Sequence, residues 1–64
     1  MDREPEPRAA RILVVDDEPN IGALLAATLR LVGLDVRVAT GGHEALVLAQ
    51  AFQPDLMVLD VMLP

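Results

Sequence analysis

The sequence predicts an α/β protein built on a three-stranded parallel sheet. Two short apolar runs, at residues 12–15 and 56–59, and one segment of alternating apolar and charged residues, at 34–38, are separated by two segments in which apolar residues recur every three or four positions. Short apolar runs are typical of buried strands, and the longer recurrence is typical of amphipathic helices. Strands that alternate with helices favour right-handed crossovers and a parallel sheet. We therefore expect a β-α-β-α-β chain with strand order 2-1-3.

Composition restricts the kinds of protein that this chain can be. At 64 residues it forms at most one small domain, with a marginal core. It has no cysteine, so neither a disulfide nor a thiolate-bound metal can stabilise it. Phe52 is its single aromatic residue, so the core must be built from aliphatic side chains.

The chain is acidic, with a formal net charge of −5 and no lysine. The lack of a basic stripe and of stacking aromatics argues against direct nucleic-acid binding. Its apolar runs are far shorter than the roughly 20 residues needed to span a bilayer. The charged N-terminus also lacks the apolar region of a signal peptide. We expect a cytoplasmic protein without membrane contact.

The first strand and the first helix follow a short leader. Residues 1–10 are expected to be flexible, because two prolines and several charges oppose regular structure. The strand should begin near Arg11, and the helix should begin at Pro19, since proline suits the first helical position. Gly33 should end that helix in the left-handed conformation. The expected apolar face of the helix consists of Ile21, Leu24, Leu25, Thr28, Leu29 and Val32.

The remaining elements are a second strand, a second helix and a third strand. The alternation over residues 34–38 predicts an edge strand. Residues 40–42 are expected to form a turn in which Thr40 can act as a cap. A helix should follow from about His43 to Phe52, with Ala45, Leu46, Ala49 and Phe52 buried. Residues 56–59 predict a strand that is interior only if something covers its outer side.

Three acids follow two neighbouring strands of the predicted sheet. Asp16 and Asp17 end the first strand, and Asp60 ends the third. Neighbouring strands lie about 4.8 Å apart, and parallel strands end at one edge, so these carboxylates should converge at the topological switch point. Clustered carboxylates suit a hard cation such as Mg²⁺, whereas the lack of cysteine and a single histidine, His43, disfavour zinc or copper.

A carboxylate beside bound Mg²⁺ can attack a phosphoryl group and form an acyl phosphate. The residues alone therefore suggest a metal-assisted phospho-acceptor aspartate. A simpler interpretation stays open, in which Asp16, Asp17 and Glu18 are an acidic helix start and Asp60 caps the loop after its strand.

Two segments resemble the receiver domain of bacterial two-component response regulators. They are L-V-V-D-D-E-P at residues 13–19 and D-L-M-V-L-D-V-M-L-P at residues 55–64. The likeness covers residues 11–64 and implies the N-terminal half of a flavodoxin-like receiver fold. A full receiver is about twice as long, and its later serine or threonine and its lysine have no counterpart here, so a truncated receiver domain is expected.

The resemblance assigns a role to each acid. Asp60 matches the phospho-acceptor, Asp17 matches the direct Mg²⁺ ligand, and Asp16 matches the neighbour that acts through water. The backbone carbonyl of Met62 matches the group that completes the metal site. The implied phosphodonor is a sensor histidine kinase. The segment V-M-L-P resembles the corresponding segment of receivers that precede a winged-helix DNA-binding domain. The parent protein is therefore expected to control transcription.

Two other functions remain open from the sequence. The chain could be a non-phosphorylatable fragment that acts only by self-association, as a homodimer or swapped pair through the exposed third strand, or by pairing with a receiver. It could also be an aspartate-nucleophile phosphatase or phosphotransferase. Such enzymes usually carry a second acid two residues after the nucleophile, where this chain has Met62, so we expect it not to be an enzyme.

Overall fold

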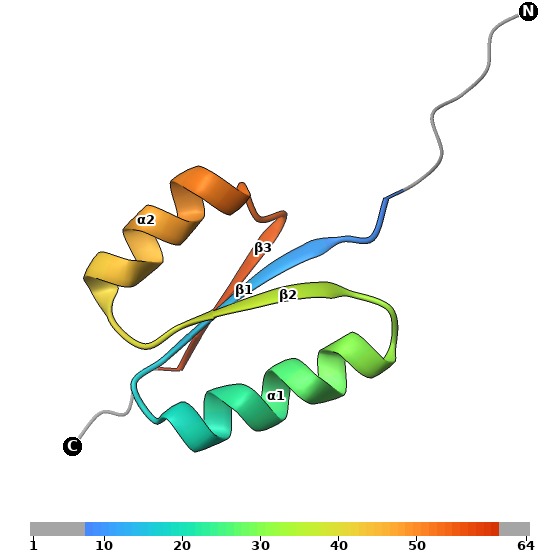
Figure 1. Cartoon of the computed structure of the whole chain (residues 1–64), viewed down its shortest axis with the longest axis horizontal. Helices are drawn as coiled ribbons and strands as arrows, with labels where there is room; N and C mark the ends of the chain where they lie inside the picture. Colours follow the sequence, from blue (N-terminus) through green and yellow to red (C-terminus); the bar gives the residue numbers. More distant parts are fainter. Residues whose placement is uncertain (1–7, 61–64) are drawn as a thin grey trace, which may run out of the picture.

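The computed structural model describes residues 8–60, the last of them by its backbone alone, as one sheet between two helices (Figure 1). The elements in order are β1 (Arg11–Asp16), α1 (Pro19–Leu31), β2 (Asp35–Ala39), α2 (Gly42–Phe52) and β3 (Leu56–Asp60). All strands run parallel in the order β2-β1-β3. The predicted fold class and strand order are therefore confirmed.

The core lies on both faces of β1, which is the central strand. Ile12 and Val14 are buried on one face with α1, and Leu13 is buried on the other with α2. This alternation follows from the two-residue period of a strand. The wholly apolar sequence of β1 is explained because both of its faces are covered.

Helix α1 begins at Pro19 as predicted, but its buried face differs from the expected one. Gly22 and Ala26 are buried and Leu25 and Leu29 partly buried, whereas Leu24 is 69% exposed. A Cβ atom on Gly22 would lie only 3.2 Å from Val38 Cγ1, so the helix approaches the sheet through its smallest residues. Ile21 and Val32 were also expected to be buried and are exposed.

The end of α1 follows the predicted glycine stop. Gly33 has φ +94°, and its N–H donates to the Arg30 carbonyl at 3.0 Å. The Leu34 N–H donates to the Leu29 carbonyl at 3.3 Å, which completes a Schellman motif. Leu29 and Leu34 both pack on the α1 side of the core. The motif therefore directs the chain back toward the sheet and into β2.

Strand β2 is an edge strand, as predicted, and a side chain covers part of that edge. Arg30 Nη2 of α1 donates to the carbonyl oxygen of Val36 at 2.7 Å. A backbone acceptor occupied in this way is less able to pair with another strand.

Helix α2 starts one residue earlier than expected, and Thr40 does not cap it. Gly41 occupies the N-cap position, and no side chain caps the helix there. Instead the Glu44 carboxylate accepts hydrogen bonds from the Thr40 N–H at 2.8 Å and from its hydroxyl at 3.2 Å. Ala45 and Phe52 are buried as predicted, but Leu46 is exposed because the inward face runs through Leu48 instead.

Strand β3 is paired on one side only among the described residues. It pairs with β1, and the two helices lie over β1 and β2 but not over β3. Leu56, Met57 and Leu59 are accordingly exposed, Leu59 to 60%. This agrees with the expectation that the strand becomes interior only when something else covers it.

The residues just before β1 contact the loop before β3. Arg8 donates to both carboxylate oxygens of Asp55, at 3.0 and 3.1 Å, and the Arg11 N–H donates to Asp55 Oδ2 at 2.8 Å. These interactions, the Arg11 N–H first and Arg8 second, hold the pKa of Asp55 below its ordinary value. A flexible leader over residues 1–10 stays a prediction, because residues 1–7 lie outside the described part.

Candidate functional site

The two acidic strand ends meet at the carboxyl edge of the sheet. Asp16 is the last residue of β1 and Asp60 is the last residue of β3, and the register places them directly opposite each other. Neighbouring strands are about 4.8 Å apart, so the two residues are close although 44 positions separate them in the sequence. Asp17 follows Asp16 directly, at the turn into α1.

Asp16 is the most unusual residue at this edge, because it is an acid only 1% exposed. Its Oδ1 accepts a hydrogen bond from the Glu18 N–H at 2.8 Å, which fixes the turn before α1. Its Oδ2 is buried and has no hydrogen-bond partner in the described structure. Leaving a buried carboxylate oxygen unpaired costs several kcal/mol. A structural role in the turn therefore explains the position of Oδ1 but not the burial of Oδ2.

Burial brings Asp16 close to the start of α1. A Cβ atom on Gly22 would lie 3.4 Å from the Asp16 Cβ, so the first turn of the helix covers this side chain. Sequence reasoning did not single out Gly22. The available signal was a glycine within a helical pattern, which is unfavourable for the helix unless close packing requires it.

Asp17 and Glu18 differ from Asp16 in being exposed. Their carboxylates make no hydrogen bond to any other residue in the described part of the chain. The interpretation of the three acids as a helix start is therefore supported for Asp16 alone, through its bond to the Glu18 N–H. Asp17 is left available for another partner.

A hard cation fits the donors that the structure describes here. The unpaired Asp16 Oδ2 and the exposed Asp17 carboxylate are oxygen donors of the kind that Mg²⁺ prefers. The side chains described within residues 8–59 contain no group of three acids or histidines placed to hold a metal. The predicted site also needs the Asp60 carboxylate and the Met62 carbonyl, and both lie outside what is described.

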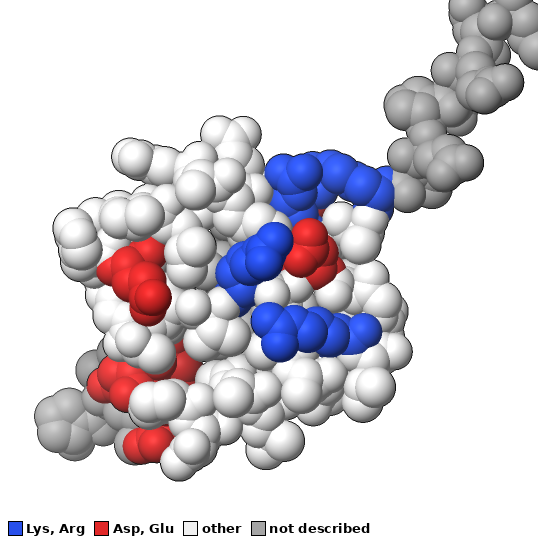
Figure 2. Space-filling model, viewed as in Figure 1, with Lys and Arg blue, Asp and Glu red and all other residues white. Residues whose placement is uncertain are grey.

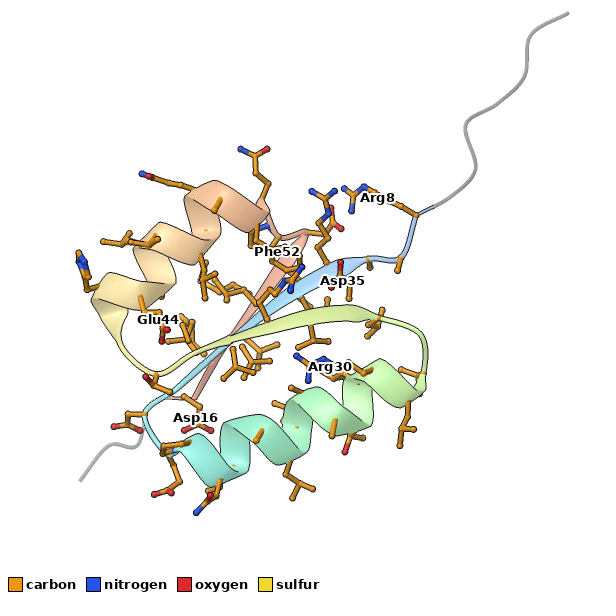
Figure 3. The ribbon with its side chains drawn as sticks, in the orientation of Figure 1. Arg8, Asp16, Arg30, Asp35, Glu44 and Phe52 are labelled. Atoms are coloured by element: carbon orange, nitrogen blue, oxygen red, sulfur yellow. The ribbon has the colours of Figure 1, made fainter. Side chains whose placement is uncertain are left out.

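The distribution of charged side chains agrees with a cation site at the carboxyl edge of the sheet. Asp and Glu gather near the end of β1, and Arg gathers near the opposite end of the sheet (Figure 2). Figure 3 shows Asp16 and Glu44 at the first end, and Arg8 and Arg30 toward the second. His43 lies at the start of α2 and is exposed, with no bond to another described residue.

Comparison with known proteins identifies the family. Residues 12–64 match the response regulator receiver domain, and this range includes all three acids and Met62. The chain belongs to this family. The observed fold agrees with this family, because a receiver domain begins with the same β-α-β-α-β order of elements.

Several curated transcriptional regulators are similar to this receiver domain. The alkaline phosphatase synthesis transcriptional regulatory protein PhoP of Bacillus subtilis is 56% identical over 54 residues, which is 84% of this chain and 22% of PhoP. The DNA-binding response regulator MtrA of Mycolicibacterium smegmatis is 46% identical over 54 residues, which is 84% of this chain and 24% of MtrA. The chain thus spans about a quarter of the length of these relatives. Among residues 8–60, neither helix is long and apolar enough to cross a membrane.

Proposed function

We propose that this receiver domain acts in phosphorelay signalling by accepting a phosphoryl group on Asp60 from a sensor histidine kinase. One observation carries the proposal. The register sets Asp60 opposite Asp16, a buried acid whose Oδ2 has no partner in the described structure. A buried unpaired oxygen beside a second acidic strand end is costly for folding and is expected where a cation and a phosphoryl group bind.

Mg²⁺ would be held by the carboxylates of Asp16, Asp17 and Asp60 and by the backbone carbonyl of Met62. When bound, it offsets the negative charge of the phosphoryl oxygens. A carboxylate oxygen of Asp60 attacks the phosphorus in line, the bond to the donor imidazole breaks, and an acyl phosphate forms. Asp16 keeps its position during this step because the Glu18 N–H holds its Oδ1.

The longer protein is proposed to control transcription in the cytoplasm. The printed names of PhoP and MtrA describe a transcriptional regulator and a DNA-binding response regulator, and this chain matches about a quarter of each. DNA binding would then reside in a part of the protein beyond this chain. This assignment favours a signalling module over an aspartate-nucleophile phosphatase.

Phosphorylation of the chain by acetyl phosphate tests the proposal. With Mg²⁺ present, intact mass spectrometry should show the addition of one phosphoryl group, and hydroxylamine should remove it as it removes acyl phosphates. Asp60→Asn should show no addition, whereas Asp55→Asn, an acid in the loop before the same strand, should be labelled like the wild type. Equal labelling of wild type and Asp60→Asn would refute Asp60 as the acceptor.

A further inference from the structure

A second feature lies at the end of the sheet opposite the acids. Each of the four basic residues in the described range 8–60 is an arginine, and blue surface gathers at this end of the molecule in Figure 2. Two acids, Asp35 and Asp55, lie at the same end, so the surface is only modestly positive.

Three of the four arginines have a structural partner. Arg8 forms a bidentate ion pair with Asp55. Arg11 Nη1 donates to the Phe52 carbonyl at 3.1 Å and so neutralises the end of α2, while Arg30 donates to the Val36 carbonyl. These guanidinium groups are explained by the fold.

Arg37 is different, because it has no hydrogen bond or ion pair with any residue in the described part of the chain. It projects from the edge strand β2 and is exposed. Its guanidinium carbon lies 4.9 Å from the centroid of the Phe52 ring, a cation–π contact that positions the group without neutralising it. The guanidinium therefore keeps hydrogen-bond donors for an external acceptor.

A hollow lies beside this guanidinium. Its volume is about 260 Å³, and it is lined by Arg37, Leu48, Ala51 and Phe52. Sites for drug-sized molecules usually measure roughly 300–1,000 Å³, so this hollow suits one or two side chains of a protein partner better than a free cofactor. Its lining combines one cation with aliphatic and aromatic carbon.

The lining also disfavours nucleic acid as the ligand. Single-stranded nucleic acid binds where bases stack on free aromatic faces along a cationic groove. Phe52 is the single aromatic residue of the chain, it is 9% exposed, and Arg37 covers its ring. A carboxylate, by contrast, matches the two-pronged geometry of a guanidinium group.

We propose that the hollow formed by Arg37, Leu48, Ala51 and Phe52 binds an acidic side chain and its aliphatic neighbour on a protein partner. The carboxylate pairs with Arg37, and the aliphatic side chain contacts Leu48 and Ala51. Asp35 lies two residues before Arg37 on the same face of β2, so the interaction is weak and reversible. The site is at the other end of the sheet from Asp60 and does not depend on phosphorylation.

The test is an NMR titration of the labelled 64-residue chain with a capped hexapeptide of alternating leucine and glutamate. Saturable amide shifts are expected at Arg37, Leu48, Ala51 and Phe52 at millimolar peptide. The matched peptide with glutamine in place of glutamate should bind about fivefold more weakly, as expected for one exposed charge pair. Asp60→Asn should leave the titration unchanged.

Three variants sharpen the result. Arg37→Gln should weaken binding of the glutamate peptide by about fivefold and abolish its preference over the glutamine peptide. Arg37→Lys should retain part of the preference, and Arg8→Gln, which removes an equal charge outside the hollow, should change the affinity less than about twofold. Equal binding of both peptides, or equal effects of Arg37→Gln and Arg8→Gln, would overturn the proposal. Stronger shifts with a single-stranded oligonucleotide would overturn it in favour of a general anion surface.

Discussion

Asp16 joins the fold to the proposed function. Its Oδ1 shapes the turn into α1 through the Glu18 N–H, and its Oδ2 is buried without a partner in the described structure. The location of Asp16 at the carboxyl edge of the sheet is predictable from the sequence, because the end of a buried, apolar strand is easily recognised. It cannot predict how the two oxygens divide their roles, since that depends on how closely α1 approaches at Gly22.

Asp16→Asn is expected to stabilise the metal-free chain by about 1 kcal/mol. The amide oxygen can still accept the Glu18 N–H, while the buried charge is removed. Urea unfolding with and without Mg²⁺ measures the effect: Mg²⁺ should stabilise the wild type and leave the variant unchanged. A variant that is less stable without metal and still stabilised by Mg²⁺ would contradict a metal-binding role for Asp16.

Asp55 should make stability depend on pH at the acidic end. Because the Arg11 N–H and Arg8 lower its folded-state pKa, its stabilisation is complete above the ordinary value of 3.8 and is lost as pH falls below that value toward the lowered pKa. Thermal unfolding measured between about pH 2 and 6 should show Asp55→Asn less stable than wild type at the upper end of this range, above the ordinary value of 3.8. The two curves should converge as pH falls, and a constant difference would refute the assignment.

At the scale of the elements, α1 shows that a periodic pattern can identify a helix without identifying its buried face. It carries two apolar stripes, and the stripe with larger residues, including Leu24 and Leu31, is the exposed one. Periodicity identified the helix, but it could not decide which stripe faces the sheet, because small residues such as Ala26 contribute little to an apolar pattern. Its end was predictable, since left-handed backbone at Gly33 is a local property.

Gly33→Ala should cost about 1 kcal/mol, because φ +94° is unfavourable for any residue with a Cβ atom. Gly42→Ala is the matched control, with open space around it and no left-handed backbone. It should be neutral or slightly stabilising in the same denaturant titration. Equal losses from both substitutions would show that the helix end does not depend on the glycine conformation.

Strand β3 should be the least protected strand. It pairs with β1 alone among the described residues, and no helix lies over it. Amide hydrogen exchange should therefore be faster for residues 57–59 than for residues 12–15 of β1, which is paired on both sides. Equal protection of the two strands would mean that another group, such as a second copy of the chain, covers β3 in solution.

At the scale of the molecule, the two ends of the sheet carry different chemistry. The carboxyl ends of the strands collect Asp16, Asp17 and Asp60, while the other end collects the arginines. The first grouping is predictable, because parallel strands must end at one edge. The hollow at Arg37 was not, since it depends on where the end of α2 places Phe52 against β2.

The most direct test of the account is an amide NMR titration of the labelled chain with Mg²⁺. We predict dispersed peaks with saturable shifts confined to Asp16, Asp17 and the residues around Asp60, and loss of saturation in Asp17→Asn. Shifts that are absent, or that are the same in Asp17→Asn as in the wild type, would contradict a metal-assisted phospho-acceptor site at this edge of the sheet.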